Sequence, residues 1–235
     1  MNPTILRIST KALLGSRRGI VMSLIPACLI VLAILVRAIA GAGVGYETVL
    51  SLGYTLALPL VALLAAAAVL GPEIDDGSIV YLLAKPVSRH TIARSKYVVA
   101  WCATMVLGAL PMLVSGLVLD SSEPVRALGW GVAGAGAGTA YTALFLALAA
   151  LTRHAVVIGL LFVLLWEGLL GNMFAGVRWA AVGAWGREVG AAVSDWVGGS
   201  DTGLTYALIA SLALTLASVW FTGDRLRSFT LRGDE

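Results

Sequence analysis

Charged residues are scarce in this chain. Only 12% of its 235 residues are Asp, Glu, Lys or Arg, and 59% are hydrophobic. Mean hydropathy is +0.93. Soluble globular domains carry about 25% charged residues. This composition therefore excludes an ordinary soluble domain and predicts a protein that lies in a bilayer.

Residues that catalyse reactions or bind metals are also few. The two cysteines, Cys28 and Cys102, fall in apolar runs, which argues against a disulfide framework. Neither histidine has a second ligand at helical spacing, so no metal site is predicted. The lysines do not follow the glycine pattern of a P-loop, and neither H-E-x-x-H nor G-x-S-x-G occurs. We therefore predict no catalytic residues, no enzyme activity and no cofactor bound by this chain.

Long apolar runs are what the sequence has instead. Six of them are long enough to cross about 30 Å of hydrocarbon as helices. They are continuously apolar and do not alternate, which argues against the strands of a membrane barrel. The predicted spans are residues 19–40, 49–71, 97–119, 128–151, 155–175 and 204–222. We predict an all-α membrane protein with six transmembrane helices in a single domain over residues 1–235.

Basic residues predict the orientation, because short cytoplasmic loops concentrate Lys and Arg. Placing the amino terminus inside puts twelve of the sixteen basic residues on the cytoplasmic side. Both termini are then cytoplasmic, as are a hairpin at 72–96 and a tail at 223–235, whereas 176–203 forms an outer loop. The net charge of +3 follows from this topology, and it gives no reason to invoke nucleic acid.

The segment before the first span has two faces. Ile5 and Leu6 lie on one helical side, and Arg7 and Lys11 on another, which predicts a helix over 1–18 in the membrane interface. A basic tail that only fixes orientation is the alternative. The first span also imitates a cleavable signal peptide ending at residues 38–40, although Arg37 just before that site argues against cleavage.

Glu167 lies near the middle of the fifth predicted span. An ionisable group there costs at least about 2.5 kcal/mol unless it is paired or faces water. With Trp166 and Asn172 it is a candidate for a translocation path or a subunit contact. A hydrogen-bonded packing glutamate is the alternative.

Two further segments have structural interpretations. Glycines at 129–138 include the pair Gly134 and Gly138, and this small-xxx-small spacing predicts close helix packing. The outer loop contains Trp179, Trp185 and Trp196, which predicts a segment in the headgroup region, with a short helix at 191–197.

Residues 72–96 form a charged segment between two apolar runs. An Asp76-Gly77 turn is followed by Ser78, a short apolar run and a break at Pro86. Ser88 then predicts the start of a second helix that presents Arg89, His90, Ile92 and Arg94. The alternative is an interfacial segment whose arginines bind lipid phosphates.

This segment resembles the cytoplasmic hairpin of ABC-2 type permeases, the membrane subunits of ATP-binding-cassette transporters. The resemblance is carried by Glu73, Gly77, Leu82-Leu83, Pro86, Ser88-Arg89 and Lys96. The six-span layout and the amphipathic start are similar too. Ser78, where threonine is common, and the acidic pair Asp75-Asp76 depart from the family pattern.

The resemblance implies a mechanism and a set of partners. Two cytoplasmic ATPase subunits, which would bind ATP and Mg²⁺, would dock beneath two permeases, the second being another copy of this chain or a similar one. Docking would use a coupling helix at 88–95. The implied coupling residues are Glu73, Gly77, Pro86, Ser88, Arg89, His90, Thr91, Ile92 and Arg94. The first, second and fifth spans would bound the path of an exporter for a hydrophobic or amphipathic substrate in a bacterial plasma membrane.

Other classes remain open on the sequence. A proton-coupled secondary carrier or channel could use Glu167 without an ATPase, although such carriers tend to show internal repeats and none is evident here. A membrane anchor for a partner enzyme would need only the hairpin.

Overall fold

The structure is a computed structural model that describes residues 17–75 and 88–228, and every regular element in these ranges is helical. This confirms the predicted all-α class. Five helical stretches are long and apolar enough to cross a membrane: Gly19–Ala40, Tyr46–Gly71, Arg89–Leu119, Pro124–Leu151 and Leu204–Leu226.

The long stretches consist of the following elements. Three of them are single helices: the first is α2 (Arg17–Ala40), the fourth is α8 (Pro124–Leu151) and the last is α12 (Leu204–Ser228). The second stretch consists of α3 (Tyr46–Leu52), η1 (Gly53–Ala57) and α4 (Leu58–Asp75). The third consists of α6 (Arg89–Thr104), η2 (Met105–Ala109) and α7 (Leu110–Leu119). Shorter elements connect α8 to α12: α9 (Ala155–Leu161), η3 (Phe162–Leu170), α10 (Gly171–Met173), η4 (Ala175–Ala180), α11 (Val182–Ala191) and η5 (Asp195–Val197).

The predicted span at 155–175 is shorter than the other five. Its apolar helix is Ala155–Leu170, about 24 Å long at 1.5 Å per residue. The helical run ends at Met173, and Phe174 has an extended backbone. Five long spans are therefore found in the described part, and the sixth stays a prediction.

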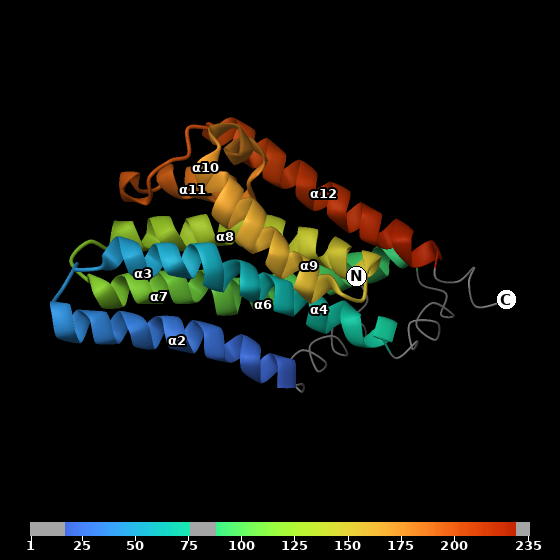
Figure 1. Cartoon of the computed structure of the whole chain (residues 1–235), viewed down its shortest axis with the longest axis horizontal. Helices are drawn as coiled ribbons and strands as arrows, with labels where there is room; N and C mark the ends of the chain where they lie inside the picture. The colour runs from blue at the N-terminus through green and yellow to red at the C-terminus, as the bar shows by residue number, and fades with distance from the viewer. Residues whose placement is uncertain (1–16, 76–87, 229–235) are drawn as a thin grey trace.

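Helix α8 is at the centre of the bundle. It packs against α4 and α7 on one side and against α11 and α12 on the other, whereas α2 lies at the edge along α7. The first turn of α2, the start of α6 and the last turn of α12 lie at one end of the bundle (Figure 1). We call this the helix-terminus end. The α2–α3 and α7–α8 connections lie at the opposite end, together with α11.

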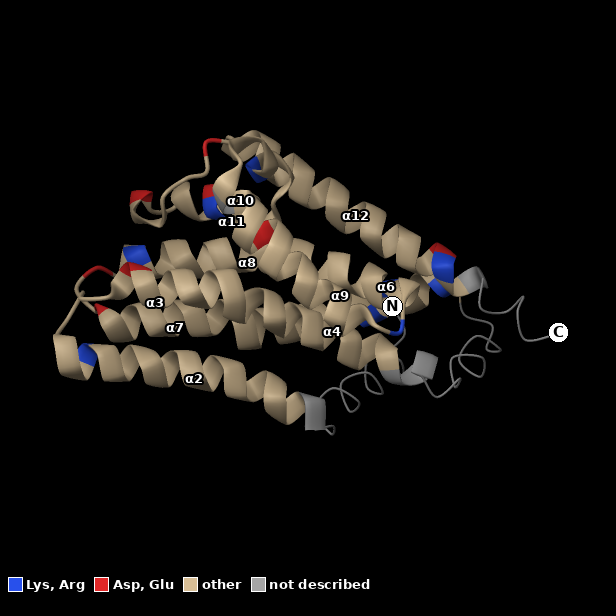
Figure 2. Cartoon of the chain, viewed as in Figure 1, with Lys and Arg blue, Asp and Glu red and all other residues tan. Residues whose placement is uncertain are grey.

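Charged residues gather at these two ends, and the helices between them are almost entirely uncharged (Figure 2). That distribution is expected of a bundle whose middle lies in hydrocarbon. Large apolar side chains of α2 and α12 are exposed, including Leu24, Leu35, Leu212 and Leu216. In a bilayer these side chains contact lipid or another subunit.

Glycines let the central helix approach its neighbours closely. A Cβ at Gly134 would lie 3.3 Å from the Ala109 Cα, and one at Gly138 would lie 3.1 Å from the Thr104 side chain. This confirms the predicted packing role of 129–138. On the other side of α8, a Cβ at Gly190 of α11 would lie 2.6 Å from the Ala133 Cβ.

The segment at 176–203 is more ordered than the predicted loop. Its main helix is α11, and the predicted helix at 191–197 is wrong apart from the short turn of η5. Trp179 and Trp196 are exposed, as expected of headgroup anchors, but Trp185 is only 7% exposed. The reason is that α11 packs against α8 and α12.

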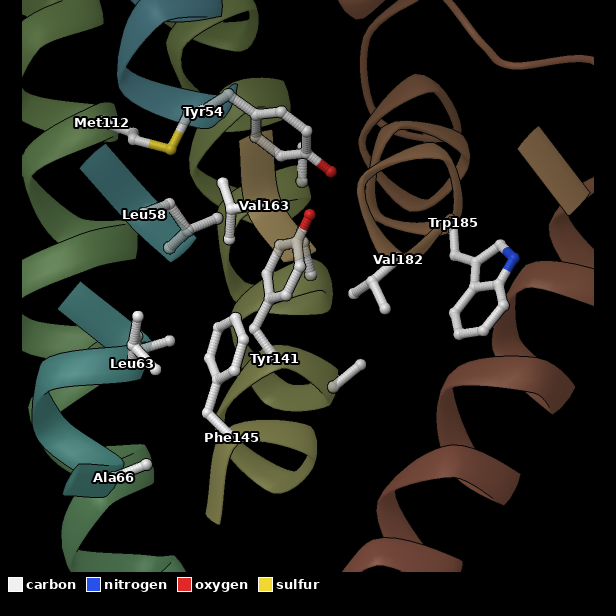
Figure 3. Packing of buried hydrophobic residues seen from close by; sticks show 14 of the residues in the cluster. Tyr54, Leu58, Leu63, Ala66, Met112, Tyr141, Phe145, Val163, Val182 and Trp185 are labelled. Carbon is white, nitrogen blue, oxygen red and sulfur yellow. The ribbon is translucent and has the colours of Figure 1, made fainter. Parts of the chain in front are cut away.

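Aromatic and aliphatic side chains fill the core beside α11. Tyr54 and Leu58 from the second span meet Tyr141 and Phe145 of α8, with Val163 of η3 nearby (Figure 3). The Tyr141 and Phe145 rings stack with their centroids 5.8 Å apart. This core fixes the positions of the two tyrosine hydroxyl groups that point towards α11 (Figure 3).

Candidate functional site

A polar cavity of about 200 Å³ lies between η1, α8, η3 and α11. The side chains that give it its chemistry are Tyr54, Tyr141, Glu167, Arg178, Arg187 and Ser200. Two of the elements that meet here, η1 and η3, are π-helical. Short π-helical segments are rare and are frequent at functional sites.

Glu167 holds the start of α11. Its carboxylate accepts hydrogen bonds from the backbone N–H groups of Val182 (2.8 Å) and Gly183 (3.1 Å). These are the first two residues of α11, whose N–H groups have no partner within the helix. A negative charge is also favourable beside the positive end of the helix dipole. Glu167 therefore caps α11 from another helix.

Both tyrosines of the cavity take part in this arrangement. The Tyr54 hydroxyl donates to the Gly183 carbonyl at 2.6 Å, and the Tyr141 side chain hydrogen-bonds the Glu167 carboxylate. The expectation that Glu167 needs a partner or a wet cavity is met by its hydrogen-bond partners. It is a hydrogen-bonded packing residue, and it also lines the cavity.

Arg187 and Arg178 bring positive charge to the same cavity. Arg187 follows Gly183 by four residues, so both lie on one face of α11. The Arg187 Cζ is 5.6 Å from the centroid of the Tyr54 ring. The sequence interpretation assigned neither arginine to a site.

The other two residues predicted beside Glu167 have different positions. The Trp166 indole donates to the Ala180 carbonyl at 3.1 Å, which ties η3 to η4. It does not line the cavity. The backbone of Asn172 belongs to α10, and its side chain lies outside the described part.

The predicted coupling residues from Ser88 to Arg94 lie at the start of α6. Gly77, Pro86 and the side chain of Glu73 are outside the described residues. Ser88 is the N-cap of α6, where its Oγ accepts the Thr91 N–H at 3.3 Å. The predicted helix start is thus confirmed, and this helix continues without a break into the third span.

Side chains at the start of α6 differ in exposure from the expectation. Arg94 is exposed, but Arg89 donates to the Leu226 carbonyl at 2.8 Å. His90 stacks on Trp220 with ring centroids 6.4 Å apart. Ile92, expected to be presented outward, is 1% exposed. Arg89 and His90 both contact α12, so the start of α6 is joined to that helix.

Lys96 makes a second connection at this end. Its side chain is fully buried, and its Nζ donates to the Val69 carbonyl of α4 at 2.7 Å. The helix-terminus ends of α4, α6 and α12 are therefore joined by hydrogen bonds from basic side chains to backbone carbonyls.

Five long apolar helices with charged ends make this chain a multi-pass membrane protein. The model of a family described as ABC-2 family transporter protein matches residues 16–170. Because the match spans more than half of the chain, the protein belongs to the ABC-2 transporter family, and the resemblance to ABC-2 type permeases is confirmed. No curated protein matches it in sequence.

Membership defines what kind of component this chain is. It is the membrane subunit of an ABC transporter and not the catalytic one. Members of the family act together with ATPase subunits. The match ends at the last residue of η3, so it includes Glu167 but not α11, Arg178 or Arg187.

Proposed function

We propose that this chain is the permease of an ABC exporter for a hydrophobic or amphipathic substrate. Separate ATPase subunits bind ATP and Mg²⁺ and dock on the helix-terminus end of the bundle. The observation that carries this proposal is the family match across 16–170, which includes Ser88 and Arg89 at the start of α6. Basic residues at this end, Arg89, Arg94, Lys96, Arg153 and Arg225, support its assignment to the cytoplasm.

Movement of the docked segment would be transmitted through hydrogen bonds at the start of α6. Arg89 connects α6 to the end of α12, and Lys96 connects it to α4. A push on 88–95 would therefore move three helices together. ATP binding would bias two states of the bundle only if the docked ATPases contact the two states differently.

The assembly proposed contains two ATPases and two permeases, the second permease being another copy of this chain or a similar chain. The exposed apolar side chains of α2 and α12 are available for contact with lipid and with a second permease. The polar cavity would belong to the path or to its outer gate, because it lies opposite the helix-terminus end.

ATP hydrolysis tests docking. The chain would be expressed with its cognate ATPase, purified as a complex and reconstituted into vesicles. Arg94→Glu should reduce ATP hydrolysis and co-purification, since a charge is reversed on the exposed side of the proposed coupling helix. Arg153→Glu is the matched control, because Arg153 is also exposed but lies between α8 and α9. Equal activity of the two variants would remove 88–95 from the docking site.

A proton-coupled carrier is the second candidate, favoured by the carboxylate of Glu167 in a polar cavity. Its test is transport by vesicles that contain the purified chain, a proton gradient and no nucleotide. Transport under these conditions would replace the ABC mechanism with the carrier.

A further inference from the structure

The polar cavity contains more basic than acidic groups. Two arginines and one glutamate are the charged residues in its lining. The glutamate is already used, since each of its oxygens accepts a backbone N–H of α11 and Tyr141 hydrogen-bonds it as well. The cavity therefore has positive charge that its own carboxylate only partly offsets.

The polar groups beside the arginines are also occupied. The Tyr54 hydroxyl donates to the Gly183 carbonyl, and the Ser200 Oγ contacts the Ala184 carbonyl and the Glu188 carboxylate. Within the ranges 17–75 and 88–228, neither the Arg187 nor the Arg178 guanidinium forms a hydrogen bond or ion pair. Arg187 lies over the Tyr54 ring and is close enough to Glu167 for their charges to attract. The N–H donors of the two arginines are the groups that a ligand could use.

Guanidinium groups favour one class of ligand. The planar fork of N–H donors matches the oxygens of a carboxylate or phosphate, and such charge-assisted bonds are about twice as strong as neutral ones. A cationic ligand would face two like charges and a carboxylate whose oxygens are engaged. The donor set thus selects for anions.

The size and position of the cavity limit the ligand further. A cavity of about 200 Å³ has room for several waters, since one water needs about 10–15 Å³ of such volume, and so it has room for a phosphate or carboxylate group. Arg178 is exposed and Arg187 is half-buried, so an anion could meet Arg178 at the entrance and Arg187 further in.

We propose that this cavity binds the anionic group, phosphate or carboxylate, of the transported molecule through Arg187 and Arg178. The inference rests on the proposed transport function and narrows its substrate class to amphipathic molecules with an anionic head. Glu167 acts as a positioning residue, because it fixes the start of α11 and with it the place of Arg187. It does not bind the anion itself.

Direct binding to the full chain in neutral detergent micelles tests the proposal. The probes are dioctanoyl phosphatidylglycerol, dioctanoyl phosphatidylcholine and inorganic phosphate, and calorimetry gives the affinities. We expect the anionic lipid to bind at least tenfold more tightly than the zwitterionic one, which has the same chains. Competition by inorganic phosphate would identify the head group as sufficient, and its failure to compete would show that the acyl part is needed as well.

Variants separate the cavity from the rest of the surface. Arg187→Gln should weaken binding of the anionic lipid about tenfold or more, and Arg178→Gln should weaken it less, since Arg178 is exposed. Arg187→Lys should retain part of the affinity because the charge stays. Arg126→Gln is the control, as Arg126 lies at the same end but pairs with Glu47 and Tyr46, and it should bind like the unchanged chain.

Two results would overturn the proposal. One is equal binding of the two lipids together with no binding of phosphate. The other is binding that survives both Arg187→Gln and Arg178→Gln. If Arg187→Gln fails to fold, as judged by thermal unfolding, Arg178→Gln and Arg187→Lys still decide the matter. Co-purification of the ATPase does not depend on this cavity, so losing anion binding would leave the permease assignment intact.

Discussion

The two ends of the bundle differ in the charged side chains that hydrogen-bond to the helix backbone. At the helix-terminus end, Arg89 and Lys96 donate to backbone carbonyls of α12 and α4. At the opposite end, the carboxylate of Glu167 accepts from backbone N–H groups of α11. Carbonyls near helix C-termini attract cations, and N–H groups at N-termini attract anions. Arg89 and Glu167 thus satisfy helix ends, whereas Lys96 binds a carbonyl inside α4, six residues before the end of that helix.

The ends differ in what remains after those contacts are made. At the helix-terminus end, the basic groups of Arg89 and Lys96 are bound to the protein's own backbone. At the cavity end, Glu167 is likewise bound to backbone groups of the protein, whereas Arg187 and Arg178 line the cavity. One end is therefore built to transmit force between helices, and the other holds donors for a ligand.

The largest expected effect concerns the close contact between Gly190 of α11 and helix α8. Gly190→Ala should destabilise the fold by about 1–3 kcal/mol, as overpacked interiors typically do. A Cβ there would lie 2.7 Å from the Gly129 carbonyl oxygen of α8. Gly136→Ala is the matched control, since its Cβ would meet Val189 at an ordinary 3.4 Å. Thermal unfolding in detergent measures both, and equal midpoints would mean that α11 does not pack on α8 in this way.

Glu167→Ala should have the next largest effect, about 2 kcal/mol, because charge-assisted hydrogen bonds to two N–H groups of α11 are lost. Glu167→Gln should cost less, since its amide oxygen still accepts one bond. The measurement is hydrogen exchange of the first turn of α11. The control is Glu47→Gln, which removes the exposed ion pair to Arg126 and should cost less than about 1 kcal/mol. Unchanged exchange in Glu167→Ala would contradict the capping role.

At the helix-terminus end, Arg89→Gln should loosen the end of α12. The lost bond to the Leu226 carbonyl has a charged donor, for which about 1.5 kcal/mol is typical. Amide exchange near Leu226 should accelerate, while the first turn of α11 should be unaffected. Arg94→Gln serves as the comparison, because Arg94 is exposed. If both variants accelerate exchange equally, the Arg89 contact does not hold α12.

Ser88→Ala should produce the smallest change, about 0.5–1 kcal/mol, which is usual for removal of an exposed N-cap. Ser88→Asp should restore the cap, since a carboxylate also accepts the Thr91 N–H. Exchange of the first turn of α6 reports the difference. A Ser88→Asp variant as frayed as Ser88→Ala would show that the cap does not stabilise this helix start.

Much of the bundle could be predicted from the sequence, because the hydropathy of a segment depends only on the residues within that segment. The five long spans, the packing glycines of α8 and the helix start after Ser88 all follow from local patterns. The span at 155–175 was harder, since its apolar run is not matched by a helix of full length.

The cavity could not be predicted in the same way. Glu167 was identified because a carboxylate in an apolar run is conspicuous, but its partners on α11 lie 15 and 16 residues further along the chain, beyond α10 and η4. Arg187 lies in a charged segment that hydropathy assigns to a loop. The small-xxx-small pair Gly186 and Gly190 was the available signal for a packed helix there.

Ile92 shows the converse error. An apolar residue between Arg89 and Arg94 was expected to face a partner, but it is buried in the bundle. Arg89 lies three residues before Ile92 and Arg94 two residues after it, so their side chains leave the helix in different directions. The sequence does not say on which side of α6 the neighbouring helices lie. Only the packing of α6 against its neighbours α4, α8 and α12 decides this.

The sequence by itself determined that this chain is an α-helical membrane protein, which helices are long enough to cross, and which family it belongs to. These properties follow from composition and from motifs within short segments. The tertiary structure alone decided that α11 packs into the bundle, that Glu167 caps it and that Arg187 shares a cavity with Arg178. The physical reason is that these contacts join residues on separate elements, whose meeting depends on how closely glycine lets α11 approach α8.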